Sequence, residues 1–238
     1  MQYRRVLIKL SGELLSSSKE STVDVVWINR VAQEICHAMD QGVQVALVVG
    51  GGNIFRGQTL ASEGIERTSA DSVGMLATVI NSVLLTDVFE QHGRAVELMS
   101  AIPILGIAEH FNLKKALSSL EEGKLVIFAG GTGNPFVTTD SAASLRAIEI
   151  SADLLLKATR VDGVYSSDPL NKKEAQRFDS ISFSDVIAKE LKVMDLGAFI
   201  QCQQYALPIC VFDVNKPKAL LRVLRGEKEG TLISEEKV

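Results

Sequence analysis

The chain has 238 residues, of which 46% are hydrophobic, and a formal net charge of −4 at pH 7. This length suits one large α/β domain or two small ones with an ample core. The slightly acidic balance argues against a general nucleic-acid-binding surface, so an anionic ligand must be held by a few placed cations and amides.

The cysteines and the apolar runs indicate the cellular compartment of the protein. Cys36, Cys202 and Cys210 form no CxxC pair, which suits small core residues in a reducing cytosol. Lys9 and Glu13 interrupt the first apolar run, so no signal peptide is expected. No run approaches the ~18 apolar residues of a membrane span. We therefore expect a cytoplasmic protein without a membrane partner.

Strand and helix patterns alternate through the first 150 residues. Short apolar runs predict strands at residues 6–8, 43–49, 95–99 and 125–129. Apolar residues at helical spacing predict a helix that begins near Thr22 or Asp24 and ends at Gly42, one that begins at 68–71 and ends at Gly93, and two at 111–122 and 141–150. This order predicts a parallel sheet with helices on both faces.

The rest of the chain continues the alternation. Further strands are predicted at residues 153–158, 209–212 and 231–233, and further helices at 184–191, 196–207 and 217–224. The D-G turn at 161–165 could enclose an adenine and its ribose, or it could be an ordinary hairpin. The composition shifts near residue 152, which suggests two lobes of one continuous sheet.

The stretch GGTGNPFVTTD, from Gly130 to Asp140, is the most informative loop. It lies between a predicted strand and a predicted helix, where open α/β sheets bind ligands. Its glycines let a phosphate approach the backbone, and free amides at a helix start favour anions. Its threonines and asparagine can donate and accept hydrogen bonds, as a nucleobase edge requires. A tight structural connection is the alternative for this loop alone.

Other strand ends carry glycines and cations. Lys9 leaves the first strand beside Ser-Gly, where it could hold a phosphate or simply be solvated. The second strand runs into GGGNIFRG at 50–57, whose Arg56 is either a planar phosphate partner or a surface arginine. Lys157 ends a later strand. Asp71 stands at the start of the long helix. Taken alone, it is more simply explained as a carboxylate that stabilises the helix start than as a ligand-binding residue.

Together these strand ends indicate phosphoryl transfer, because transfer between two anions needs cations at both phosphates. No GxxxxGK[ST] motif occurs, which excludes a P-loop enzyme. No GxGxxG motif opens a helix, which weakens a dinucleotide-binding interpretation.

Five motifs closely resemble the bacterial uridylate (UMP) kinases, a branch of the amino acid kinase superfamily. They are KLSGE at 9–13, GGGNIFRG at 50–57, GMLATVIN at 74–81, GTGNPFVTTDSAA at 131–143 and KATRVDGVYSSDP at 157–169. The resemblance covers nearly the whole chain. It implies an α/β fold of the carbamate kinase-like type: a three-layer α/β/α sandwich on a mostly parallel sheet of about eight strands, as a single domain over residues 1–238.

The resemblance also implies an activity, in which MgATP and UMP give ADP and UDP in pyrimidine nucleotide biosynthesis. It implies a UMP site in an N-terminal lobe of about residues 1–152 and an adenosine site in a C-terminal lobe of about 153–238. Members of the branch are usually cytoplasmic homohexamers that UTP inhibits. No protein metal ligand is assigned, because Mg²⁺ would be held mainly by ATP oxygens and water.

Roles for individual residues follow from the same resemblance. Lys9 and Lys157 would stabilise the transferring charge, and Asp140 would orient both lysines. The residues that would hold ATP phosphates are Lys9, Leu10, Ser11, Gly12, Gly52 and Arg56, the last also placed in the catalytic group. The adenosine site would be lined by Thr159, Tyr165 and Asp168. UMP would be held by Gly51, Asp71 (suited to a ribose hydroxyl), Thr132, Gly133, Asn134, Pro135, Phe136, Val137, Thr138 and Thr139.

Two stretches depart from the family pattern. Many members have a glycine-rich GFGID-like stretch where this chain reads ESTVD at 20–24, so activation by GTP is not expected. Residues 68–72 read TSADS where TGD followed by histidine is common, which leaves Asp71 in place.

Two alternative functions stay open. One is another superfamily kinase, acting on carbamate, an amino acid or a phosphorylated small molecule. The other is a non-catalytic nucleotide sensor or storage protein on the same fold. The presence together of Lys9, Arg56, Asp140 and Lys157 argues against the second, since a binder need not keep a transition-state clamp.

Overall fold

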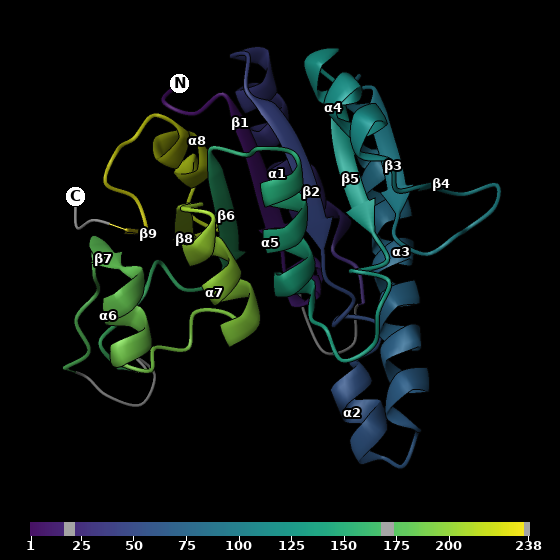
Figure 1. Ribbon diagram of the computed structural model, residues 1–238. Helices are drawn as coiled ribbons and strands as arrows, with labels where there is room; N and C mark the ends of the chain where they lie inside the picture. Colours follow the sequence, from purple (N-terminus) through teal and green to yellow (C-terminus); the bar gives the residue numbers. More distant parts are fainter. Residues whose placement is uncertain (17–21, 168–173, 236–238) are drawn as a thin grey trace.

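The computed structural model describes residues 1–16, 22–167 and 174–235, which form a sheet with helices on both faces (Figure 1). The strands are β1 (Arg5–Leu10), β2 (Gln44–Val49), β3 (Val96–Ser100), β4 (Glu109–His110), β5 (Leu125–Ala129), β6 (Leu154–Thr159), β7 (Ser180–Ser182), β8 (Ile209–Asp213) and β9 (Thr231–Ser234). The helices are α1 (Val25–Asp40), α2 (Gly57–Ser62), α3 (Arg67–Gln91), α4 (Leu113–Glu121), α5 (Thr139–Glu149), α6 (Phe183–Ala188), α7 (Leu196–Gln204) and α8 (Ala219–Leu224), with a 3₁₀ helix η1 (Gly12–Leu15).

The sheet is mostly parallel, as the sequence predicts. Its strand order is β4-β3-β5-β2-β1-β6-β8-β9-β7, and among the described strands only β8 and β9 pair antiparallel. β1 lies between β2 and β6, and its register places Lys9 beside Lys157. Because parallel strands share one carboxyl edge, the ends of β1, β2, β5 and β6 deliver their loops to the same side of the molecule.

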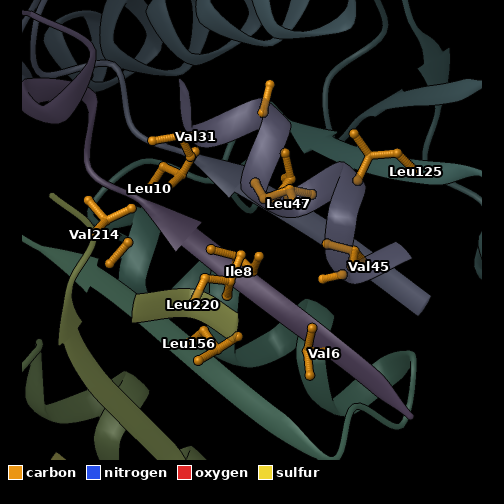
Figure 2. Close-up of a cluster of buried hydrophobic side chains, with 14 of the residues drawn as sticks. Val6, Ile8, Leu10, Val31, Val45, Leu47, Leu125, Leu156, Val214 and Leu220 are labelled. Carbon is orange, nitrogen blue, oxygen red and sulfur yellow. The ribbon is translucent and has the colours of Figure 1, made fainter. Parts of the chain in front are cut away.

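Apolar layers on the two faces of the sheet confirm the three-layer arrangement. Along β1, Ile8 packs with α1, α3 and α8, while the preceding Leu7 packs with α4, α5, α6 and α7. This alternation follows from the period of two in a strand. Figure 2 shows the first layer, in which Ile8, Leu47 and Leu156 of three neighbouring strands meet Val31 and Leu220 of the covering helices.

The edges of the sheet differ from the prediction. β4 and β7 bring the sheet to nine strands, where about eight were expected. They have two and three residues, too few for an apolar period to be visible. The helix α2 was not predicted either. α8 begins at Ala219 and not at 217, because Lys218 adopts a left-handed φ of 59° that no helix contains.

Helix α3 is more apolar than the sequence analysis allowed. An 18-residue window within it has a mean hydropathy of 1.6, so by length and composition alone this one described helix could cross a membrane. Polar residues such as Ser72 and Asn81 interrupt the helix, so it holds no continuous apolar run of that length. In the fold 44% of that window is buried, and Leu85, Val88 and Phe89 pack against the sheet, as in a core helix.

The three cysteines lie in described parts of the chain and are buried free thiols, as the sequence predicts. Burial raises the pKa of the Cys202 and Cys210 thiols to about 12. Both are therefore neutral core residues at physiological pH.

Candidate active site

Two lysines meet at one carboxylate at the carboxyl edge of the sheet. Asp140 lies in the first turn of α5, which covers β1. Its Oδ1 is 2.9 Å from Lys9 Nζ, and its Oδ2 is 2.7 Å from Lys157 Nζ. All three side chains are between 11% and 14% exposed. The structure thus brings together three residues that are far apart in the sequence, as a buried cluster with one excess positive charge.

Burial disfavours the charged forms of Asp140 and Lys157, and the ion pair between them favours those forms. Burial alone would raise the pKa of Asp140, but attraction to Lys9 and Lys157 outweighs it and holds that pKa below the ordinary value. Burial lowers the pKa of Lys157; Asp140 works against this change and Lys9 adds to it. The charged form of Lys157 is therefore favoured by the carboxylate of Asp140.

The start of α5 is held by Thr138 and by Asp195, and the sequence analysis missed Asp195. Thr138 caps the helix: its Oγ1 accepts hydrogen bonds from the backbone N–H of Asp140 at 3.1 Å and of Ser141 at 3.3 Å. The Thr138 hydroxyl in turn donates to Asp195, which also accepts from Ser141 Oγ and caps α7 through Ala198 N. Asp195 thus ties α5 to α7 and fixes Asp140. Its one sequence signal was an aspartate directly before a predicted helix.

The loops after β1 and β2 touch through their backbones. A Cβ placed on Gly12 would lie 2.5 Å from Gly52 N and 2.7 Å from Gly50 O, so only glycine fits there. Gly52 itself has more room, with Glu13 and Arg56 as its neighbours. Arg56 pairs with Glu13, and both side chains are about half exposed, at 55% and 54%. The backbone of Gly12 therefore lies directly against the glycine loop after β2.

Asp71 reaches the loop from Gly130 to Asp140 across 65 residues of sequence. Its Oδ2 accepts a hydrogen bond from Phe136 N at 2.8 Å and one from Arg67 Nε at 2.8 Å. Burial would raise the pKa of Asp71, but the hydrogen bonds from Phe136 and Arg67 outweigh it and hold that pKa below the ordinary value. The Arg67 guanidinium also lies over the Phe136 ring, 5.5 Å from its centroid. Arg67 was missed.

The same loop presents side chains to solvent. Phe136 is 65% exposed with a φ of 67°, and Val137 is 43% exposed. Thr132 Oγ1 accepts from Asn134 N at 3.3 Å, which closes a turn around Gly133. Gly51, by contrast, packs against α3, because a Cβ there would lie 2.8 Å from Gly74 O.

A cavity of about 570 Å³ opens beside the end of β6. Its lining includes Thr159, Tyr165 and residues 189–193. The Thr159 hydroxyl donates to Val161 O, and Tyr165 Oη donates to Asp162 Oδ1 at 2.6 Å, so both hydroxyls shape the wall. This volume lies within the usual range of small-molecule sites.

Two of the three predicted adenosine residues, Thr159 and Tyr165, line this cavity, and the third, Asp168, lies outside the described residues. The wall at 189–193 was missed because the sequence predicts helix as far as 191, whereas α6 ends at Ala188. Lys157 stands two residues before Thr159 on β6, and Asp140 directly follows the loop that Asp71 contacts. Through these neighbours along the chain, the lysine–aspartate cluster is linked both to the wall of the cavity and to that loop.

Comparisons with known proteins show the family and the fold of the chain. The model of the amino acid kinase family matches residues 4–213. The chain is 50% identical over 233 residues to the uridylate kinase of Coxiella burnetii, covering 98% of this chain and 96% of the relative. It is 51% identical over 233 residues to that of Vibrio cholerae, with the same coverage. The crystal structure of UMP kinase from Bacillus anthracis matches with a TM-score of 0.96 and 39% identity, covering 99% of this chain and 98% of that one.

Proposed function

The chain belongs to the amino acid kinase family, and we propose that within it the chain is a uridylate kinase, which transfers the γ-phosphoryl group of ATP to UMP and releases ADP and UDP. The observation that carries this proposal is the bridging of Lys9 and Lys157 by Asp140, close along the chain to Thr159 of the cavity and to the polar loop at 130–139. The names of the similar proteins support UMP as the acceptor. The product UDP would place the reaction in pyrimidine nucleotide biosynthesis.

In this proposal the chain supplies charge and position. Phosphoryl transfer needs little covalent help from a protein, but charge on the transferring oxygens must be stabilised. Lys9 and Lys157 donate to those oxygens, and Asp140 orients both ammonium groups. The ATP phosphates are held by Lys9, Leu10, Ser11, Gly12, Gly52 and Arg56. Arg56 must leave Glu13 to do so, which its exposure permits.

Mg²⁺ would enter with ATP. Among the described residues no three His, Cys, Asp or Glu side chains are grouped as metal ligands, and Asp140 is already paired with two lysines. This donor set suits a cation held by ATP oxygens and water. When bound, Mg²⁺ neutralises phosphate charge, while the residues named above orient the nucleotide.

The two substrates are proposed to occupy separate lobes of one domain. The adenosine of ATP takes the cavity in residues 153–238, beside Thr159 and Tyr165, with Asp168 as a further contact. UMP takes the N-terminal lobe of residues 1–152, held by Gly51, Asp71 and residues 132–139. Because Asp71 already holds Phe136 N, a ribose hydroxyl would share this carboxylate with the loop.

Assembly, regulation and location complete the proposal by analogy with the family. The chain is proposed to be a cytoplasmic homohexamer that UTP inhibits. The decisive experiment is a coupled assay of ADP release with purified protein over UMP, CMP, dUMP and AMP, with carbamate as a further acceptor. Turnover that depends on UMP supports the proposal. Turnover with carbamate alone would favour another superfamily kinase, and nucleotide binding without any turnover would favour a sensor.

We expect a strong preference for UMP over CMP. Uracil presents a ring N–H between two carbonyls, a pattern that backbone groups and the Thr and Asn side chains of 132–139 can match. Cytosine would leave buried polar groups unpaired, which costs roughly ten-fold or more in kcat/KM. The measurement is kcat/KM for each nucleotide at saturating ATP, with dUMP as the matched control that keeps the base. Comparable values for UMP and CMP would contradict this prediction.

We also expect weak or absent activation by GTP. The stretch expected to bind a purine triphosphate reads ESTVD at 20–24, without the usual glycines and with an acidic side chain that repels phosphate. Residues 17–21 lie outside the described part of the chain, so this prediction rests on the sequence. The measurement is the initial rate against GTP at subsaturating ATP and UMP. A saturable rise of several-fold would overturn it.

A further inference from the structure

Three polar side chains of α3 are buried where that helix passes the glycine loops. Thr78, Asn81 and Ser82 are at most 4% exposed, in a helix whose other buried residues are mostly apolar. Thr78 and Asn81 belong to the GMLATVIN motif, to which the roles above assign nothing. Burying a polar side chain is unfavourable unless its hydrogen bonds are made, so the partners of these three are informative.

Asn81 holds the start of the loop after β2. Its Nδ2 donates to Gly50 O and to Asn53 Oδ1, both at 2.7 Å. Asn53 Nδ2 donates back to Asn81 Oδ1 at 3.2 Å and onward to Thr22 O at 2.7 Å. Every donor of both amide groups is therefore in use. Asn81 thus fixes two residues of the 50–57 loop, holding Gly50 by its backbone carbonyl and Asn53 by its side chain.

The orientation of Gly50 decides where the next amides point. Within residues 1–16, 22–167 and 174–235, the backbone N–H groups of Gly51 and Gly52 donate to no other group. These amides are free for a phosphate, but only a fixed loop can aim them. Gly12 packs directly against Gly50 O, so the position of this carbonyl also sets the β1 loop.

Thr78 performs the equivalent task for the loop after β5. Its Oγ1 accepts a hydrogen bond from Gly130 N at 2.8 Å, and its hydroxyl donates to Met75 O at 2.7 Å. Gly130 is the first residue of the loop assigned to the acceptor. β2 and β5 are neighbours in the sheet, and Thr78 and Asn81 lie one helical turn apart. One face of one helix therefore holds the first residue of both substrate loops.

We propose that Asn81 and Thr78 are positioning residues for the transfer reaction: Asn81 orients the 50–57 backbone toward the nucleotide phosphates, and Thr78 orients the 130–139 loop toward the acceptor. This inference rests on the proposed function for its substrates. It assigns neither residue a contact with substrate. It makes α3 the common support of the two loops, so that a defect at either residue acts on its own loop first.

The test compares Asn81→Ala and Asn81→Asp with Thr78→Val, and uses Ser82→Ala as the matched control. Ser82 is fully buried one residue beyond Asn81, but its Oγ donates within the helix, to Thr78 O at 2.8 Å. Hydrogen–deuterium exchange is measured for peptides covering 50–57, 130–139 and β1, together with KM for ATP and UMP and kcat. Losing one such buried contact is worth about ten-fold in an equilibrium.

The expected result is a crossed pattern. Both Asn81 variants raise exchange in 50–57 about ten-fold and lower kcat. Thr78→Val raises exchange in 130–139 and the KM for UMP, with less effect on ATP. Ser82→Ala changes neither loop. Equal exchange in both loops for every variant, or a matching rise in the β1 peptide that reveals general destabilisation, would overturn the proposal. If the unaltered chain fails to phosphorylate UMP, the proposed function fails, but the exchange pattern still decides this inference.

Discussion

Replacing Lys9 with alanine is expected to lower kcat for UDP formation by about 10³-fold, while ATP binding weakens far less. The Lys9 ammonium is buried at the end of β1 and shares Asp140 with Lys157. A cation in such a place acts on charge that develops during transfer, so its loss is felt mainly in the transition state. The measurements are kcat by a coupled ADP-release assay and the Kd of ATP by calorimetry.

A matched control separates this effect from a general loss of positive charge. Lys124 directly precedes β5, at the amino ends of the parallel strands and so away from the candidate site. It pairs with Glu122 on the surface. Lys124→Ala should leave kcat unchanged, because surface ion pairs contribute little. Near-normal turnover of the Lys9 variant would remove Lys9 from the catalytic role, and a weaker Kd for ATP with an unchanged kcat would make it a binding residue only.

The interior of the sheet could be predicted from the sequence, and its edges could not. β1, β2, β5 and β6 are buried on both faces, so each contains a short run of consecutive apolar residues. β4 and β7 cover the two edges with two or three residues and have no such signal. The short helix α2 was not predicted for a similar reason, because six residues that begin with glycine are too few to show a helical period.

The candidate site shows a comparable division. Lys9 and Lys157 could be selected because each stands at a strand end, and Asp140 was added by the resemblance to the family; the parallel sheet brings these ends together. The contacts that hold the surrounding loops could not be predicted. Asp71 takes a backbone N–H of Phe136 and Asp195 takes the hydroxyl of Thr138, contacts that span 65 and 57 residues of sequence. Such contacts depend on how loops fold over the sheet edge, which local pattern does not encode.

Replacing Asp140 with asparagine is expected to destabilise the protein as well as to inactivate it. Asparagine keeps the shape but leaves two buried lysines without an anion. Breaking a buried ion pair from one side costs about 3–5 kcal/mol, which corresponds to a fall in Tm of roughly 10 °C for a chain of this size. kcat should fall as well, because both lysines lose their orientation. The measurements are calorimetric Tm and kcat, with Glu122→Gln as a surface control that changes neither.

The pH dependence identifies the cause of that loss. Because the folded-state pKa of Asp140 is held below its ordinary value, its contribution to stability is present above that ordinary value and disappears as pH falls through the folded pKa. The difference in Tm between the two proteins should therefore be full at neutral pH and shrink in acid. Burial already lowers the pKa of Lys157, and loss of the carboxylate lowers it further. The variant should thus regain stability as pH rises from neutral toward 10, since Lys157 can then lose its proton in the folded state. A Tm difference that is constant across this range would show that Asp140 acts through packing, not through its charge.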